Sequence, residues 1–255
     1  MVAGVGMTRF GKHTESGLKA LGAAAVTAAL EDAGVTPADL DAAFVGNAAA
    51  GVITGQECIR GQVVLRSLGI GKIPVVNVEN ACGSGSTALH EACALVSAGC
   101  YETVLVLGVE KLYHADRTRV AAAFAGAIDV EAARAAASGS GAADRTAVFM
   151  DLYAEHARAH MERYGTTVEH FAAVSAKNSF HGSLNPRAQF RDVLSVEDVL
   201  AEPMIASPLT RAMCSPIGDG AAAVVVVTEA RARRLGVQRP VRALTSVLRS
   251  GWDGV

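Results

Sequence analysis

The sequence predicts an α/β fold, in which helices flank a mixed β-sheet, on the strength of three observations. Short apolar runs alternate with segments of helical periodicity along residues 1–110. The runs 103–109 and 221–227 are apolar throughout, which is typical of strands that are covered on both faces. Apolar residues make up 51% of the 255-residue chain but aromatic residues only 5%, so we expect a core of alanine, valine and leucine.

The expected elements follow from apolar periodicity and from residues that begin or end helices. Gly34 is well placed to end the first helix, because glycine readily adopts the left-handed conformation of a helix terminus. Thr54 and Glu57 have the spacing of a capping box at the start of the next helix. We expect strands over 2–7, 42–45, 74–78, 103–109 and 221–227, and helices over about 16–33, 54–68, 86–96, 147–164, 168–179, 196–201 and 228–235.

The composition changes after Lys111. Residues 121–144 are rich in alanine, glycine and serine, and we expect 138–141 to be a mobile loop. The helices expected beyond this loop make the inserted part mainly helical. The sequence therefore predicts a sheet domain over 1–110 and 204–238 that is interrupted by a mainly helical domain over 111–203.

Charge and cysteine usage exclude several functional classes. The formal charge is −2 and basic residues form no stripe, so we expect no nucleic-acid partner. We expect no membrane span and no signal peptide, because no apolar run reaches the length required. His156 and His160 have metal-ligand spacing but lack an acidic third ligand, so we expect no metal. The cysteines are odd in number and unpatterned, which favours a reducing cytoplasm: Cys58, Cys82, Cys93, Cys100 and Cys214.

One cysteine has the surroundings of a nucleophile. Cys82 lies between an expected buried strand, 74–78, and the first turn of a helix. Unpaired N–H groups and the positive end of the helix dipole favour a thiolate at such a position, and the thiolate is the nucleophile. Gly83 and Gly85 allow a substrate to approach the backbone closely. The alternative is a small packed thiol in a tight turn, which is the interpretation that we prefer for Cys214.

Two segments carry a resemblance to a known family. Residues 80–92, NACGSGSTALHEA, resemble the nucleophile turn of the thiolases, in particular the branch of the sterol carrier protein and non-specific lipid-transfer thiolases. Residues 177–192, KNSFHGSLNPRAQFRD, resemble the loop-domain pattern of the same branch. The resemblance implies a layered thiolase-like fold, with 111–203 as a loop domain that covers the active site and receives CoA. It also implies that 239–255 begin a C-terminal thiolase domain that is otherwise absent.

The resemblance further implies an acyl-CoA acyltransferase. In that family the cysteine at the position of Cys82 takes the acyl group as a thioester, in 3-ketoacyl-CoA thiolysis or in the reverse Claisen condensation. Coenzyme A is then a substrate, and no cofactor is bound. The catalytic histidine, second cysteine and further oxyanion donors of the family belong to its second half, whose motifs we do not find here. The family also implies a homodimer, joined by pairing of the strand that precedes the nucleophile.

Two alternatives stay open. The chain is a non-catalytic or aldolase-type thiolase-like subunit of a complex that degrades lipid, steroid or aromatic acyl-CoA, with a small OB-fold partner, or it is a truncated domain without activity. Cys82 in an intact turn favours acyl transfer over the aldolase branch. Asp219 and Gly220, before the strand 221–227, are expected to form a tight turn rather than to take part in catalysis.

Overall fold

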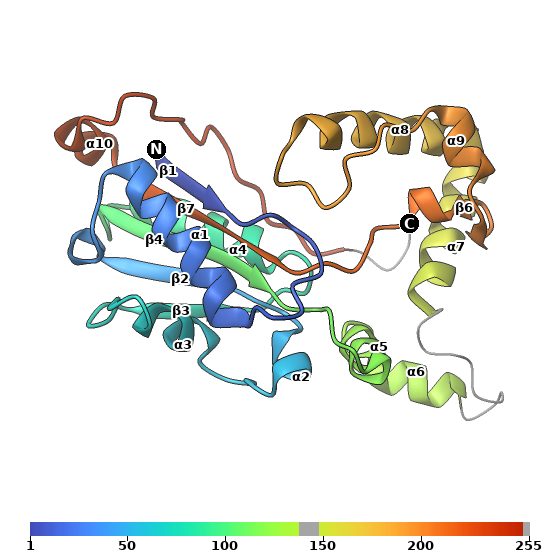
Figure 1. Cartoon of the computed structure of the whole chain (residues 1–255), viewed down its shortest axis with the longest axis horizontal. Helices are drawn as coiled ribbons and strands as arrows, with labels where there is room; N and C mark the ends of the chain where they lie inside the picture. Colours follow the sequence, from blue (N-terminus) through green and yellow to red (C-terminus); the bar gives the residue numbers. More distant parts are fainter. Residues whose placement is uncertain (138–147, 252–255) are drawn as a thin grey trace. The chain divides into compact units, whose positions relative to one another are not determined.

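The computed structural model describes residues 1–137 and 148–251, which form two compact units. The first unit contains Met1–Thr8, Lys12–Leu112 and the chain from Asp219 onward. The second contains Arg9–Gly11 and Tyr113–Gly218 (Figure 1). Residues 204–218, which we expected in the sheet domain, thus cluster with the helical unit. The loop expected over 138–141 lies outside the described residues.

A five-stranded mixed sheet is the centre of the first unit. The strand order is β1 (Val2–Met7), β7 (Gly220–Val227), β4 (Thr103–Glu110), β2 (Ala42–Gly46) and β3 (Val75–Val78). Strand β2 runs parallel to both β3 and β4, and β7 runs antiparallel to β4 and β1. The parallel pairs require crossover connections, which helices α3 (Arg60–Arg66) and α4 (Ser84–Ser97) provide.

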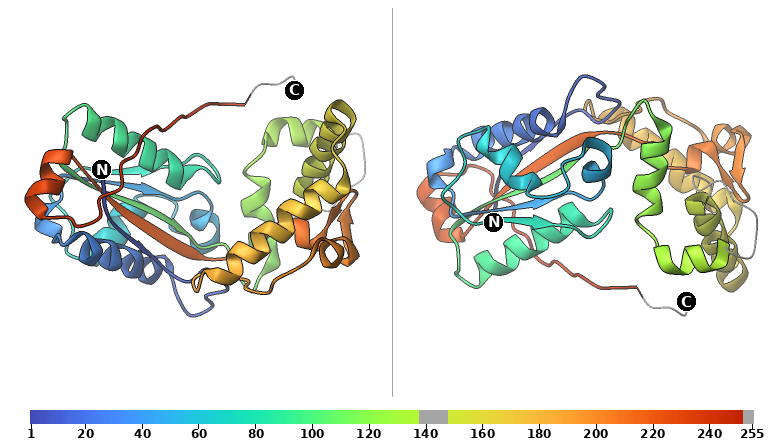
Figure 2. Two further views of the ribbon diagram at one scale, coloured as in Figure 1. Left: turned by 90° about the horizontal axis from the view of Figure 1, so that it is seen from above. Right: turned by 90° about the horizontal axis from the view of Figure 1, so that it is seen from below.

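Helices cover the sheet on both faces, as the apolar strands predict. Alternate residues of β4 point to opposite sides, so Leu105 and Leu107 join one buried cluster while Val104 and Val106 join another. The first cluster contains residues of α1 (Leu18–Ala33) and α3, and the second contains residues of α4. Figure 2 shows α1 and α4 on opposite sides of the strands.

Two glycines allow α1 to lie directly on β1. A Cβ atom at Gly4 would overlap the backbone of Ala33, and one at Gly6 would overlap the backbone carbonyl of Ala25. Because neither strand residue has a side chain on this face, the alanine side of α1 packs against the backbone of the strand. Gly34 ends this helix in the left-handed conformation, with φ of 66°, as expected.

The second unit is mainly helical. Its only described strands are the short pair β5 (Met204–Ala206) and β6 (Leu209–Thr210), which is antiparallel. Its helices are α5 (Arg117–Ala125), α6 (Val130–Ala137), α7 (Val148–Tyr164), α8 (Val168–Leu184) and α9 (Val196–Ala201), and the first unit adds α2 (Ala50–Thr54) and α10 (Glu229–Leu235). Helix α8 continues to Leu184 rather than ending near residue 179. Within the described residues, no helix is both long enough and apolar enough to cross a membrane.

The helix expected over 54–68 is wrong. Helix α2 ends at Thr54, because Gly55 adopts a left-handed conformation with φ of 83°, and α3 begins only at Arg60. The Thr54 hydroxyl donates to the carbonyl oxygen of Ala50 at 2.6 Å, so Thr54 is not the cap of a following helix. Cys58 therefore lies in an exposed connection rather than on the apolar side of a helix.

Candidate active site

Cys82 lies in a tight turn between the end of β3 and the start of α4. Gly83 is the N-cap residue, α4 begins at Ser84, two residues earlier than predicted, and the Cys82 side chain is exposed. The Gly83 N–H donates to the carbonyl oxygen of Asn80 at 2.9 Å. Ala81, directly before the cysteine, has a φ of 45°, a left-handed conformation that is uncommon for a residue with a side chain.

Side chains tie this turn together. The Asn80 N–H donates to Ser84 Oγ at 2.8 Å, and Ser84 Oγ donates to the carbonyl oxygen of Ala81 at 2.7 Å. The Ala81 N–H donates to Glu79 Oε1 at 2.7 Å. Asn80 Nδ2 donates to Thr87 Oγ1 at 2.9 Å, so the turn is also attached to the first turns of α4. The direction of the Cys82 backbone is therefore fixed by several independent bonds.

Glycines let the turn rest on the ends of two other strands. A Cβ atom at Gly46, the last residue of β2, would lie 2.5 Å from the backbone carbon of Ser84. Gly85 and Gly108 meet closely, since a Cβ atom built on Gly108 lies 3.4 Å from the Cα of Gly85. The start of α4 is thus held at the carboxyl ends of β2 and β4.

The partly buried carboxylate of Glu110 joins the same strand ends. Asn47 Nδ2 donates to Glu110 Oε1 at 2.9 Å and to the carbonyl oxygen of Val109 at 2.6 Å. The Glu110 carboxylate also accepts from the N–H groups of Ala48 and Ala49, at 3.0 and 3.2 Å. These bonds hold β2 against β4 directly after the glycines that support the Cys82 turn.

Asp219 and Lys111 form a buried ion pair. Lys111 Nζ lies 2.6 Å from Asp219 Oδ2, and their side chains are 10% and 0% exposed. Lys111 Nζ also donates to the carbonyl oxygen of His13 at 2.6 Å. The Asp219 carboxylate accepts from the N–H groups of His13 and Leu112, at 3.1 and 2.8 Å. The structural role expected for Asp219 thus takes the form of a buried ion pair at the entry to β7.

The other cysteines fall into two groups. Burial raises the pKa of the Cys93 and Cys214 thiols, so less of each is thiolate at neutral pH. Cys58 and Cys100 are exposed, as Cys82 is. Cys58 also lies two residues before the first residue of α3, as Cys82 does before α4. A position at a helix start therefore does not by itself distinguish Cys82, contrary to our expectation.

The sequence model described as "Thiolase, N-terminal domain" matches residues 1–230. The chain belongs to the thiolase family. This confirms the resemblance of residues 80–92 and 177–192, and it confirms the mixed sheet with flanking helices.

Curated relatives of this thiolase-family chain are longer than the chain. "Benzoylsuccinyl-CoA thiolase subunit BbsB" from Thauera aromatica is 37% identical, with 98% of this chain and 60% of the relative covered. "Acetyl-CoA acetyltransferase" from Methanothermobacter thermautotrophicus is 40% identical over 98% of this chain and 62% of its own length. "Sterol carrier protein 2" from Homo sapiens is 34% identical over 93% and 43%. The chain thus spans about three fifths of the first two relatives.

A solved structure described as "Ltp2-ChsH2(DUF35) aldolase" is similar to this thiolase-family chain. Its TM-score is 0.68 and its sequence identity 28%, over 91% of this chain and 56% of the other. The solved structure of "human mitochondrial 3-ketoacyl-CoA thiolase in complex with CoA" has a TM-score of 0.65 at 16% identity, over 92% of this chain and 66% of the other, which confirms a thiolase-like fold.

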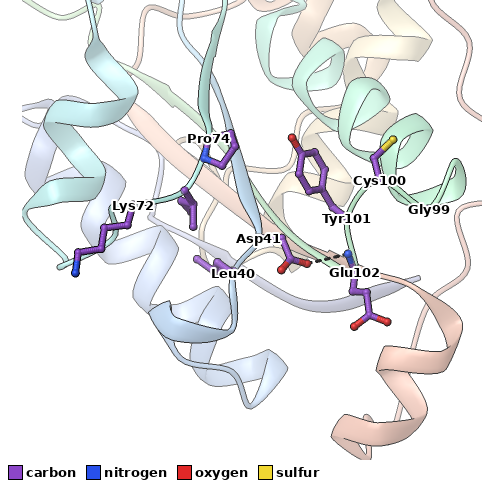
Figure 3. Close-up of a pocket in the computed structure, with 9 residues that line it drawn as sticks. Leu40, Asp41, Lys72, Pro74, Gly99, Cys100, Tyr101 and Glu102 are labelled. Atoms are coloured by element: carbon purple, nitrogen blue, oxygen red, sulfur yellow. Dashed lines mark hydrogen bonds between the residues drawn. The ribbon is translucent and has the colours of Figure 1, made fainter.

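The first unit of this thiolase domain also has an open pocket of about 470 Å³. It lies at the amino-terminal ends of the strands, where β2, β3 and β4 begin (Figure 3). Cys82, in contrast, lies at their carboxyl ends and follows the end of β3. Asp41 Oδ2 accepts from the N–H groups of Glu102 and Thr103, both at 2.8 Å, and the Lys72 side chain points away from Tyr101. Asp41 is thus engaged by the backbone, and the Lys72 side chain is directed elsewhere.

His160 and His90, two of the histidines considered in the sequence, form contacts with hydroxyl groups. His160 Nδ1 lies 2.9 Å from Thr166 Oγ1, and its ring lies 4.7 Å from that of Tyr164. The described part of the chain contains no group of three or more histidine, cysteine or acidic residues that could hold a metal ion. His90, on α4, contacts Ser246 Oγ at 2.9 Å through Nδ1.

Proposed function

We propose that this chain is the N-terminal part of a thiolase-type acyltransferase in which Cys82 accepts the acyl group. The observation that carries the proposal is the exposed Cys82 thiol in a turn that side chains and glycines fix to three strand ends. Membership of the thiolase family and 40% identity to a protein named as an acetyl-CoA acetyltransferase support it.

The proposed chemistry has two steps. In thiolysis, Cys82 Sγ attacks the 3-carbonyl carbon of a 3-ketoacyl-CoA, and the bond between carbons 2 and 3 breaks. Acetyl-CoA leaves after its α-carbon gains a proton, and the remaining acyl group stays on Sγ. The thiolate of free CoA then attacks the thioester carbonyl, which releases acyl-CoA and returns the electron pair to Cys82. The backbone N–H of Cys82 is the group that we propose as one donor to the oxyanion. Coenzyme A serves as a substrate, and no bound cofactor is required.

The proton transfers require acid–base groups, and no hydrogen bond joins Cys82 Sγ to such a group within residues 1–137 and 148–251. We propose that a histidine, a second cysteine and further oxyanion donors come from a second thiolase half outside these 255 residues. General acid–base groups contribute roughly 10²–10⁴-fold each, and an oxyanion donor contributes on the order of 10²–10³-fold. The chain alone should therefore accept an acyl group slowly and turn over near the background rate.

CoA-dependent cleavage of a 3-ketoacyl-CoA tests this proposal. The assay compares the 255-residue chain alone with the chain supplemented by, or fused to, a second thiolase half. We expect turnover only with the second half, and its loss on Cys82→Ala. Turnover by the chain alone at ordinary enzyme rates, roughly 1–10³ s⁻¹, would show that the catalytic groups are misassigned.

An aldolase-type or non-catalytic subunit is the second candidate. It is favoured by the similar structure described as an Ltp2-ChsH2(DUF35) aldolase and by the relative named as a thiolase subunit. On this hypothesis the chain works with a small OB-fold partner in the degradation of lipid, steroid or aromatic acyl-CoA. The Cys82→Ala variant separates the candidates in the assembled protein, because it abolishes thiolysis but leaves a retro-aldol cleavage intact.

We also propose a cytoplasmic location and a homodimer. All five cysteines are free thiols, which fits a reducing compartment.

A further inference from the structure

The backbone before Cys82 adopts a conformation that needs support. Ala81 is left-handed, with φ of 45°, and residues with a side chain are rarely found there. Such conformations persist where the surrounding structure over-determines them, and they cluster at functional sites. The contacts that hold Ala81 in this conformation therefore also direct the cysteine that follows it.

Side chains bind both backbone polar groups of Ala81. Its N–H donates to Glu79 Oε1 at 2.7 Å, and its carbonyl oxygen accepts from Ser84 Oγ at 2.7 Å. Ser84 Oγ in turn accepts from the Asn80 N–H at 2.8 Å. The Ser84 hydroxyl thus bridges the two residues that precede Cys82. The Ala81 carbonyl oxygen also accepts from the Ser84 N–H at 3.1 Å, and Ser84 itself is only 4% exposed.

The connection around Cys58 gives an internal contrast. Ile59, directly after Cys58, is also left-handed, with φ of 49°, and precedes α3. In the part of the chain that the structure describes, no side chain donates to or accepts from the Ile59 backbone. Nearby side-chain bonds run instead from Gln56 Nε2 to the carbonyl oxygen of Cys58, at 2.7 Å, and from the Gln56 N–H to Thr54 Oγ1, at 3.2 Å. Two exposed cysteines thus precede helices. Of the two left-handed residues beside them, Ala81 is held by side-chain hydrogen bonds to its backbone, whereas Ile59 has none from the described residues.

We propose that Ser84 and Glu79 are positioning residues that hold Ala81 in its left-handed conformation and thereby fix the direction of the Cys82 thiol. This inference rests on the proposed function, since it assigns to these residues the orientation of the proposed nucleophile. Neither side chain is required to touch substrate.

Iodoacetamide alkylation of the full 255-residue chain tests the role of Ser84. The rate at Cys82, measured by peptide mass spectrometry, is divided by the rate at Cys58 in the same sample. We expect Ser84→Ala to lower this ratio by about three- to tenfold, the effect of losing a partly buried hydrogen bond. The matched control is Ser86→Ala, because Ser86 Oγ donates to the carbonyl oxygen of Gly83 at 2.9 Å and does not reach Ala81. An unchanged or higher ratio in Ser84→Ala would overturn the inference.

A rescue variant distinguishes a role of Ser84 in orienting Cys82 from a general role in stabilising the fold. Glycine adopts left-handed backbone without steric cost, so Ala81→Gly added to Ser84→Ala should recover most of the lost ratio. A merely structural role for Ser84 predicts no recovery, and it predicts faster labelling of the half-buried Cys93 instead. Failure of the rescue would contradict the proposed cause.

Glu79 supplies a second test that does not depend on a buried side chain. Glu79 is exposed, so Glu79→Ala should fold, and we expect it to lower the Cys82 ratio. Glu79→Gln keeps an acceptor oxygen and should stay close to wild type. A normal ratio in Glu79→Ala would remove Glu79 from the inference.

If Cys82 in the wild type reacts no faster than Cys58, the proposed function loses its nucleophile and this inference falls with it. If Cys82 is fast but insensitive to Ser84→Ala, the inference alone fails.

Discussion

Lys111 and Asp219 show how burial sets the importance of a single charge. The Asp219 side chain is fully buried, and Lys111 is its charged partner. Without the ammonium group, the carboxylate would lose the cation that lies 2.6 Å from its Oδ2 atom. Removing one member of a buried pair costs far more than removing an exposed one, since the remaining charge cannot be hydrated.

We therefore expect Lys111→Met to lower the free energy of unfolding by about 3–5 kcal/mol. Arg233→Ala is the control, because its ion pair with Glu229 is largely exposed and should contribute at most about 1 kcal/mol. Chemical denaturation of both variants measures the difference. A loss for Lys111→Met no larger than that of the control would show that the pair is dispensable.

The five thiols should react in a definite order. Burial raises the pKa of Cys93 and Cys214, so both hold less thiolate than an ordinary cysteine at a given pH. At about pH 8 we expect Cys82 to alkylate first and Cys93 and Cys214 last, with the difference shrinking as the pH rises. Brief labelling followed by mass spectrometry measures the order, and preferential labelling of Cys58 or Cys100 would contradict it.

Local patterns predicted the position of Cys82 but not its supports. The strand, the turn and the helical periodicity around Cys82 are neighbours in sequence, so the pattern places the residue. Lys111 and Asp219 are 108 residues apart, and no local pattern links them. Ser84 was part of the predicted turn, but its bonds depend on the left-handed Ala81, which propensity does not indicate. Cys58 was misplaced because Gly55 ends a helix that apolar spacing alone would continue.

At the scale of elements, the contact between α1 and β1 depends on the absence of two side chains. Gly6→Ala would place a methyl group against the backbone of α1 near Ala25. Backbone cannot move aside as a flexible side chain can, so we expect a loss of about 1–3 kcal/mol in the free energy of unfolding, as for overpacked cores. Gly71→Ala is the control, because nothing lies within 4 Å of its Cβ position. Equal stability of the two variants would mean that α1 shifts at little cost.

The type of most elements follows from the sequence, but their exposure does not. Helix α1 and strands β4 and β7 are long and apolar, and they appear where the pattern puts them. The run 74–78 looks equally apolar, yet β3 is an edge strand and Val76 is 42% exposed. The position of a strand in the sheet is set by its pairing with strands that are distant in sequence. The composition of one strand therefore does not predict whether that strand lies at an edge.

At the scale of the whole molecule, the exposed edge at β3 is the basis for the proposed homodimer. An edge strand presents unpaired backbone groups, and native proteins cover or blunt such edges. We expect Val76→Lys to convert a dimer into a monomer at micromolar concentration, as measured by light scattering. Val5→Lys is the control, because Val5 is 56% exposed on β1, the strand at the opposite edge of the sheet from β3. A monomeric wild type, or a dimeric Val76→Lys variant, would contradict this arrangement.

The most direct test of the central claim is the site of acylation. The 255-residue chain is incubated with an acyl-CoA, and the acylated residue is mapped by mass spectrometry. We predict slow formation of a single adduct on Cys82 that is released by hydroxylamine, as a thioester should be, and that is absent from Cys82→Ala. Equal acylation of Cys58 or Cys100 would contradict the role of Cys82 as the nucleophile. So would the absence of acylation at Cys82 when a second thiolase half is supplied.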